Sequence, residues 1–150
     1  MQSAIRLGLI LMFTCSALTA TAEDKKDLDK PKFTEKGHTV DSLDVVKGRL
    51  KEKAAVLIDV REPAEWERGH LEQAKLVPLS VIRTGKLTKE MKKSLPKDKP
   101  IYTHCGSGGR VLIVFKLLKK EGYDIRPLQD GFNNLVKAGF KKAKEKPAKG

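Results

Sequence analysis

Two patterns of hydrophobic and polar positions alternate along the middle of the chain. Short apolar runs at residues 54–60, 76–78, 101–104 and 123–128 are typical of strands. The first run is apolar until a charge near its end, as expected for a central strand that is covered on both faces. Between these runs, apolar residues recur three or four positions apart, which indicates helices. The alternation predicts an α/β fold with a mainly parallel sheet.

The expected helices have recognisable ends. Asp41 is placed to cap a helix that has one apolar face. A short helix is expected over residues 63–69, because Pro63 suits a first turn and Gly69 suits a C-terminal cap. Further helices are expected along the stripe of Leu87, Met91 and Leu95, over residues 110–121 before Gly122, and over residues 132–138 before Gly139.

The N-terminal residues have the pattern of a secretory signal peptide. Arg6 supplies a basic start, residues 7–13 form an apolar run too short to span a bilayer, and residues 20–22 (ATA) offer a cleavage site. We therefore expect residues 1–22 to be a signal peptide and the protein to be periplasmic. No other stretch is long and apolar enough to anchor the mature chain, so an integral membrane segment is not expected.

Charged stretches flank the expected domain. Residues 23–36 carry many charges and little apolar periodicity, which is typical of a flexible leader. Residues 141–150 form a similar basic tail. One folded domain is therefore expected over residues 37–140, in keeping with a chain of 150 residues.

The formal net charge of +12 predicts attraction to anions, whether small oxyanions, acidic proteins or lipid headgroups. Nucleic acid is not an expected partner, because the lysine-rich segments lack interleaved aromatic residues for base stacking.

Cys105 is the expected reactive residue. The other cysteine, Cys15, lies in the signal peptide, so the mature chain has one thiol and no internal disulfide. Cys105 ends a predicted strand and opens the segment CGSGGR, residues 105–110, from which a helix follows. In open α/β sheets, ligands bind beyond the carboxyl ends of the strands.

The glycines of residues 105–110 allow successive backbone N–H groups to converge as an anion nest. The start of the following helix adds unpaired amides and the positive end of its dipole. These groups would stabilise a thiolate, or a persulfide formed on it. A buried structural cysteine is the alternative, but it leaves three glycines in four residues without a role. A nucleotide-binding loop is disfavoured, because Val111 stands where a third spaced glycine is needed.

Two more motifs accompany this segment. Residues 59–71 read DVREPAEWERGHL, and Asp130-Gly131-Phe132 is followed by Ala138-Gly139-Phe140. With the cysteine loop, these motifs resemble the rhodanese-like domain family over about residues 40–140. The resemblance implies a rhodanese-like fold, with a mainly parallel five-stranded sheet and helices on both faces, and no cofactor.

The resemblance also implies a function. Cys105 would be catalytic, taking a sulfane sulfur from a donor such as thiosulfate and passing it to a thiophilic acceptor such as cyanide or a thiol. The implied partners are therefore a small anionic sulfur donor and this acceptor, and a monomer is expected. The residues implied to bind substrate through the cradle are Gly106, Ser107, Gly108, Gly109 and Arg110.

Rhodanese-related phosphatases and arsenate reductases are a second hypothesis. Their loops place five residues between cysteine and arginine, whereas four separate Cys105 from Arg110. The shorter loop fits a sulfur atom better than a tetrahedral oxyanion. A third hypothesis is a non-catalytic module that binds a sulfur species or an anion.

The remaining polar residues are interpreted as structural. Asp59, Arg61 and Glu65 are expected to form an ion-pair network near a strand end. His104 is expected to point to the face of its strand opposite Cys105. No metal site is expected, because the histidines and Cys105 lack metal-ligand spacing.

Overall fold

The computed structural model describes residues 30–144. The chain divides into two units, residues 1–30 and 31–150, and the described fold is that of the second unit. The expected signal peptide, most of the expected leader and residues 145–150 lie outside the described residues. Within the described part, no helix has the length and apolar character needed to cross a membrane.

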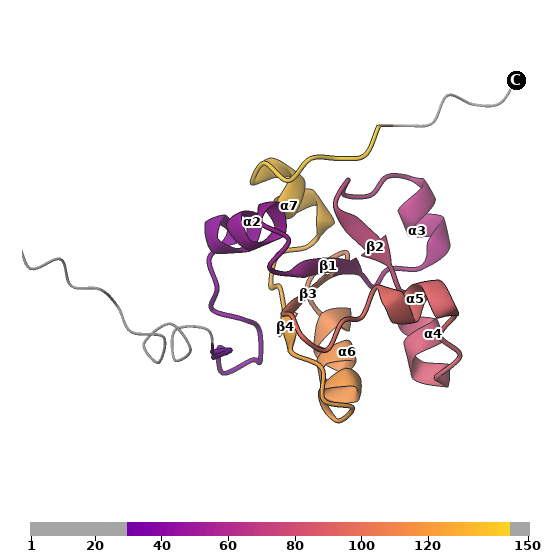
Figure 1. Ribbon diagram of the computed structural model, residues 1–150. Helices are drawn as coiled ribbons and strands as arrows, with labels where there is room; N and C mark the ends of the chain where they lie inside the picture. Colours follow the sequence, from indigo (N-terminus) through magenta and orange to yellow (C-terminus); the bar gives the residue numbers. More distant parts are fainter. Residues whose placement is uncertain (1–29, 145–150) are drawn as a thin grey trace, which may run out of the picture. The chain divides into compact units, whose positions relative to one another are not determined.

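A parallel sheet lies at the centre of the fold, with its strands in the order β2-β1-β3-β4 (Figure 1). The strands are β1 (Val56–Asp59), β2 (Ala74–Leu76), β3 (Ile101–His104) and β4 (Ile125–Pro127). The helices are α2 (Leu43–Lys51), α3 (Pro63–Glu67), α4 (Leu79–Thr84), α5 (Lys89–Lys93), α6 (Arg110–Lys119) and α7 (Phe132–Lys137).

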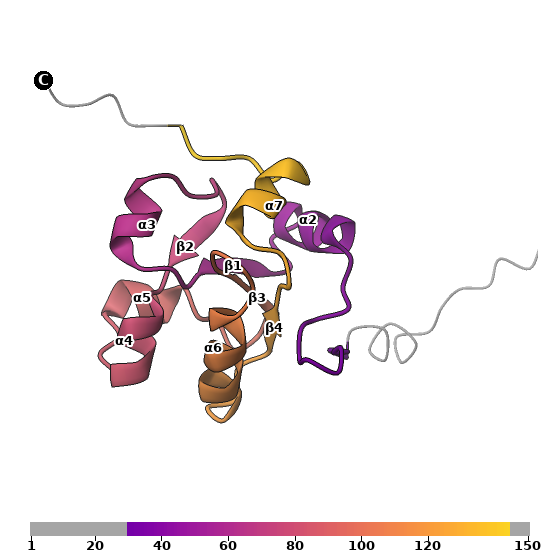
Figure 2. The ribbon, with the colours of Figure 1, turned by 180° about the vertical axis from the view of Figure 1, so that it is seen from behind.

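Helices cover both faces of the sheet. In both ribbon views, α2 and α7 lie on one side, and α4, α5 and α6 lie on the other (Figure 1 and Figure 2). Leu57 and Tyr102, which are register partners on β1 and β3, belong to the apolar core that includes residues of α2 and α7. Ile58 and Ile101 belong to the core that includes residues of α4 and α6. The predicted parallel α/β fold is confirmed.

The number of strands differs from the expectation. The described residues form a four-stranded sheet, so a five-stranded sheet is not confirmed. Beside β4, the N–H of Thr39 donates to the carbonyl of Pro127 at 2.8 Å, but this contact does not continue as a ladder. Pro127 has no N–H to donate, and proline is typical of an edge strand.

Helix α6 holds the start of the cysteine loop against the sheet. Its residues Val111, Val114 and Leu118 are buried, and the helix packs on β3, β4 and α4. Burying an aliphatic side chain of this size stabilises a fold by about 1.5–3 kcal/mol. This packing fixes Arg110, the first residue of α6, near the end of β3.

Short segments at both ends of the described chain pair with the fold. Residues 31–40 form a hairpin, in which Phe33 and Thr39 are bridge partners and the N–H of Gly37 donates to Thr34. At the other end, Lys142 bridges Leu71. The hairpin includes residues 31–36 of the expected leader, and the second pairing includes part of the expected basic tail.

The predicted cap of the first described helix is wrong. Ser42, and not Asp41, is the N-cap of α2, and its hydroxyl accepts a hydrogen bond from the N–H of Val45. The carboxylate of Asp41 instead accepts hydrogen bonds from Tyr102 and Arg126. The Asp41 carboxylate therefore binds two buried donors of the sheet, although the sequence pattern alone assigns it to the start of the helix.

Candidate functional site

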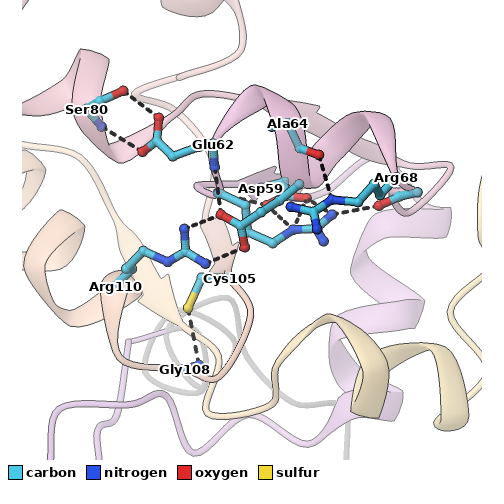
Figure 3. Close-up of polar contacts among 11 residues, drawn as sticks. Asp59, Glu62, Ala64, Arg68, Ser80, Cys105, Gly108 and Arg110 are labelled. Atoms are coloured by element: carbon cyan, nitrogen blue, oxygen red, sulfur yellow. Dashed lines mark hydrogen bonds and ion pairs between the residues drawn. The ribbon is translucent and has the colours of Figure 1, made fainter.

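Cys105 lies at the carboxyl end of β3, where the chain turns into α6. Its side chain is fully buried and belongs to the apolar core on the α6 side of the sheet, with Val111 and Val114. Its Sγ accepts a hydrogen bond from the N–H of Gly108 at 3.2 Å, and Figure 3 shows the sulfur pointing toward that residue. The loop therefore folds back over the thiol and presents a main-chain donor to it.

The three loop glycines have different conformational needs. Gly108 has φ +83°, and a Cβ there would overlap the carbonyl oxygen of Gln129, so both conformation and space favour glycine. A Cβ on Gly106 would lie 3.2 Å from Nη2 of Arg110, which is a tight contact. Gly109 is the N-cap of α6, in a right-handed conformation with open space around it. Strict dependence on glycine is thus expected at position 108.

The motif after β4, residues 130–132, packs against the cysteine loop. The N–H of Phe132 donates to the carbonyl of Cys105 at 2.9 Å. A Cβ on Gly131 would overlap the carbonyl oxygen of Gly106. The closing motif quoted from the sequence therefore lies directly against the cysteine loop, which explains why a glycine is needed there.

Arg110 is paired with Glu65. Its Nη1 and Nη2 donate to the two carboxylate oxygens of Glu65 at 2.5 and 2.7 Å. The hydrogen bonds from Arg110 lower the pKa of Glu65 to about 2. The same bonds raise the pKa of Arg110, and the nearby Cys105 raises it further. A permanent positive charge therefore lies beside the thiol, already engaged by a carboxylate.

The start of α3 fixes Glu65. A capping box joins Glu62 and Glu65, and the N–H of Glu62 donates to the Glu65 carboxylate at 3.2 Å. The carboxylate of Glu62 also accepts a hydrogen bond from the hydroxyl of Ser80 at 2.6 Å (Figure 3). This arrangement gives the Glu65 carboxylate a defined position against Arg110.

A hollow of about 360 Å³ opens beside the loop. Its positive wall includes Arg61, whose guanidinium binds the carboxylate of Asp59 and the carbonyl of Gly69. The same guanidinium lies 4.2 Å from the ring centroid of Phe132, as a cation–π contact. The residues that line the hollow are Arg61, Glu65, Arg68, Gly69, Gly106, Phe132 and Asn133.

The structure separates the predicted ion-pair network into two parts. Asp59 pairs with Arg61, whereas Glu65 pairs with Arg110 of the loop. Of the implied substrate-binding residues, Gly108 is buried and Arg110 is partly exposed, while Gly106, Ser107 and Gly109 are exposed. Sequence reasoning did not find Arg68 or Asn133 on the hollow, since neither is close to Cys105 along the chain.

His104 lies beside Asp59 and not with the thiol. Its Nε2 is 3.7 Å from the nearer carboxylate oxygen of Asp59, its partner in strand register. Burial lowers the pKa of His104 to about 4, so the ring is neutral at neutral pH. Among residues 30–144, no cluster of three or more histidine, cysteine or acidic side chains is placed to hold a metal ion.

The fold and the site together define an α/β domain in which a buried cysteine begins a glycine loop at the end of a central strand. The family model of the rhodanese-like domain matches residues 42–138. The chain therefore belongs to the rhodanese-like domain family.

Two curated relatives illustrate the similarity. "Probable adenylyltransferase/sulfurtransferase MoeZ" of Mycobacterium tuberculosis is 29% identical over 146 residues, covering 83% of this chain and 36% of MoeZ. The protein YqhL of Bacillus subtilis is 38% identical over 81 residues, covering 53% of this chain and 60% of YqhL. The chain thus matches less than two thirds of the length of either relative.

Solved structures agree on the fold. A rhodanese-related protein from Thermoplasma volcanium has a TM-score of 0.55 at 25% identity, covering 67% of this chain and 93% of that one. The human single-domain sulfurtransferase TSTD1 has a TM-score of 0.57 at 23% identity, covering 65% and 94%. Proteins named as sulfurtransferases are among the relatives that the chain resembles.

Proposed function

We propose that this protein is a sulfurtransferase that moves a sulfane sulfur from a donor such as thiosulfate to cyanide or a thiol through a persulfide on Cys105. The observation that carries the proposal is the sulfur of Cys105, which accepts a main-chain hydrogen bond from Gly108 next to the charge of Arg110. Both groups favour negative charge on sulfur, as the attacking thiolate requires.

The reaction has two steps, which balance without an external oxidant or reductant. The thiolate of Cys105 attacks the outer sulfur of thiosulfate, a new S–S bond forms, and sulfite leaves with the electron pair of the broken S–S bond. The acceptor then attacks the terminal sulfur of the persulfide, and the Cys105 thiolate leaves. With cyanide the product is thiocyanate, and with a thiol it is a new persulfide.

The residues around Cys105 indicate where an anionic sulfur donor would bind. The hollow reaches the loop at Gly106, and its wall includes Arg61 and Arg68. A donor oxyanion that binds Arg110 replaces one carboxylate contact of Glu65, because both compete for the same guanidinium. The buried position of Cys105 limits contact of the persulfide with water.

Intact mass spectrometry tests the proposal. Protein treated with thiosulfate is expected to gain the mass of one sulfur atom, and cyanide is expected to remove it with release of thiocyanate. Cys105→Ser is the matched control, since it changes one atom and is expected to abolish both events. Absence of the adduct with several donors would contradict the proposal.

Two other results would assign a different function. A stable adduct that no acceptor removes would indicate a sulfur-binding module without turnover. Cys105-dependent hydrolysis of an aryl phosphate would indicate the phosphatase hypothesis instead.

A further inference from the structure

The ring of His38 contacts the cysteine loop from the N-terminal hairpin. His38 is 7% exposed, and its Nε2 lies 2.9 Å from the carbonyl oxygen of Gly108. A carbonyl oxygen accepts hydrogen bonds and cannot donate them, so Nε2 carries the proton in this contact. The contact joins residues 70 positions apart in the chain. His38 also lies outside the residues matched by the family model.

The hairpin that carries His38 is held against the rest of the fold. Thr39 donates its N–H to Pro127 of β4, and the Phe33 ring lies 4.9 Å from that of Phe115 on α6, centroid to centroid. Within the hairpin, the N–H of His38 donates to Oγ1 of Thr34 at 3.2 Å. These contacts restrict the ring of His38, so its bond to Gly108 can act as an anchor.

The anchor acts at Gly108, the loop residue whose conformation is most restricted. Gly108 has φ +83° and lies against the carbonyl of Gln129, so it holds a conformation that few other residues adopt. Its N–H donates to Sγ of Cys105, while its carbonyl accepts from His38. Because a trans peptide unit is planar, fixing this carbonyl toward His38 turns the N–H of Gly109 the opposite way.

We propose that His38 is a positioning residue of the persulfide cradle. By holding the carbonyl of Gly108, it fixes the peptide plane that carries the N–H of Gly109 and presents that amide to the sulfur atoms formed on Cys105. This inference rests on the proposed sulfur transfer, and it adds a residue from the N-terminal hairpin to the machinery. His38 acts through the loop and does not touch the reacting atoms.

The test compares His38→Leu with His38→Gln. Leucine fills similar volume without a donor, whereas the glutamine side-chain amide can donate from near the position of Nε2. The rate of sulfur loading from thiosulfate is measured by quenched intact mass, over a range of donor concentrations. We expect His38→Leu to lower the maximal loading rate by about 10–100-fold, by analogy with the loss of a hydrogen bond that orients a metal ligand. His38→Gln should recover most of this rate, and the half-saturating donor concentration should change little.

Alkylation of Cys105 by iodoacetamide gives a readout that does not depend on sulfur transfer. In His38→Leu, the midpoint of the pH profile of alkylation should move to higher pH, because the Gly109 amide is no longer held in place to stabilise the thiolate. His70→Leu is the matched control. The ring of His70 also meets one backbone carbonyl, that of Trp66 at 3.2 Å, but not the loop, so both readouts should stay at wild-type values.

Different results would contradict the proposed function and the positioning role of His38. If wild-type protein never gains sulfur, the proposed function fails, and the alkylation profiles alone decide whether His38 orients the loop. If a folded His38→Leu variant loads and alkylates like wild type, the positioning role is wrong. Folding is checked by thermal unfolding, and His38→Met replaces the leucine variant if that one does not fold.

Discussion

Two clusters of arginine and carboxylate lie in this domain, and they differ in what surrounds them. One cluster, which we name the sealed cluster, consists of Asp41, Arg49, Tyr102, Asp124 and Arg126. The other is the pair of Glu65 and Arg110 at the cysteine loop. The Arg126 side chain is 2% exposed, whereas that of Arg110 is 31% exposed.

In the sealed cluster, the polar groups bind one another. Arg126 donates to Asp41 and Asp124 at 3.0 Å, and the Tyr102 hydroxyl donates to Asp41 at 2.5 Å. Burial, assisted by Asp41, raises the pKa of Tyr102 to about 12. At the loop, Glu65 lines a hollow and its partner Arg110 lies beside a thiol. Asp124 of the sealed cluster also lines a hollow, of about 350 Å³, but no cysteine is among the residues that line it. Shifted pKa values occur in both clusters, so the thiol beside Arg110 is the better mark of function here.

The largest expected loss of stability comes from removing an arginine from the sealed cluster. Arg126→Met removes the buried cation that pairs with both Asp41 and Asp124. Loss of one partner of a buried pair typically costs about 3–5 kcal/mol of unfolding free energy, and the cost here should not exceed this range, because Arg49 still pairs with Asp41 and Asp124 is partly exposed. Urea denaturation at pH 7 measures this cost. Sulfur loading per folded molecule should not change. A stable Arg126→Met variant with slow loading would show that the two clusters are not separate in function.

An effect of similar size concerns His104, which lies one residue from the thiol but beside Asp59. Its pKa is lowered from 6.5 to about 4 by burial, so between these values the unfolded chain binds a proton that the folded chain does not. Stability should therefore be complete above about pH 6.5 and should fall by about 3 kcal/mol as the pH decreases to about 4.

Urea denaturation between pH 7 and pH 4 checks this expectation. Replacing the ring in His104→Asn should remove the contribution of His104 and flatten the profile over that range. Equal slopes for the variant and the wild type would mean that His104 is protonated in the folded protein, contrary to its buried position.

The smallest expected loss of stability comes from alanine substitutions at two glycines of the cysteine loop. Gly108→Ala should destabilise the fold by about 1–3 kcal/mol, because alanine is strained at φ +83° and its Cβ meets the Gln129 carbonyl. Gly109→Ala has open space and a right-handed conformation, and should be close to neutral. Thermal unfolding and sulfur loading compare the two. Equal losses in both variants would contradict the assignment of Gly108 as the restrained residue.

Local pattern was sufficient to predict most elements and the position of Cys105 between a strand and a helix. It did not predict α4, and it placed the second strand at residues 76–78, whereas β2 spans Ala74–Leu76. The same patterns did not predict the partners of Asp41, because Tyr102 and Arg126 approach it only after the strands have paired. His38 was missed for a related reason. Its neighbours in sequence are charged and lack periodicity, and its contact with Gly108 depends on a hairpin that packs on α6 and β4.

The hydrogen bond from Phe132 to Cys105 has a consequence for the order in which the site is completed during synthesis. Cys105 emerges from the ribosome well before Gly131 and Phe132, whose backbone supports its loop. A nascent chain that stops before these residues carries a thiol without the cradle that would activate it. The reactive sulfur site is therefore finished only when the last helix of the domain is available.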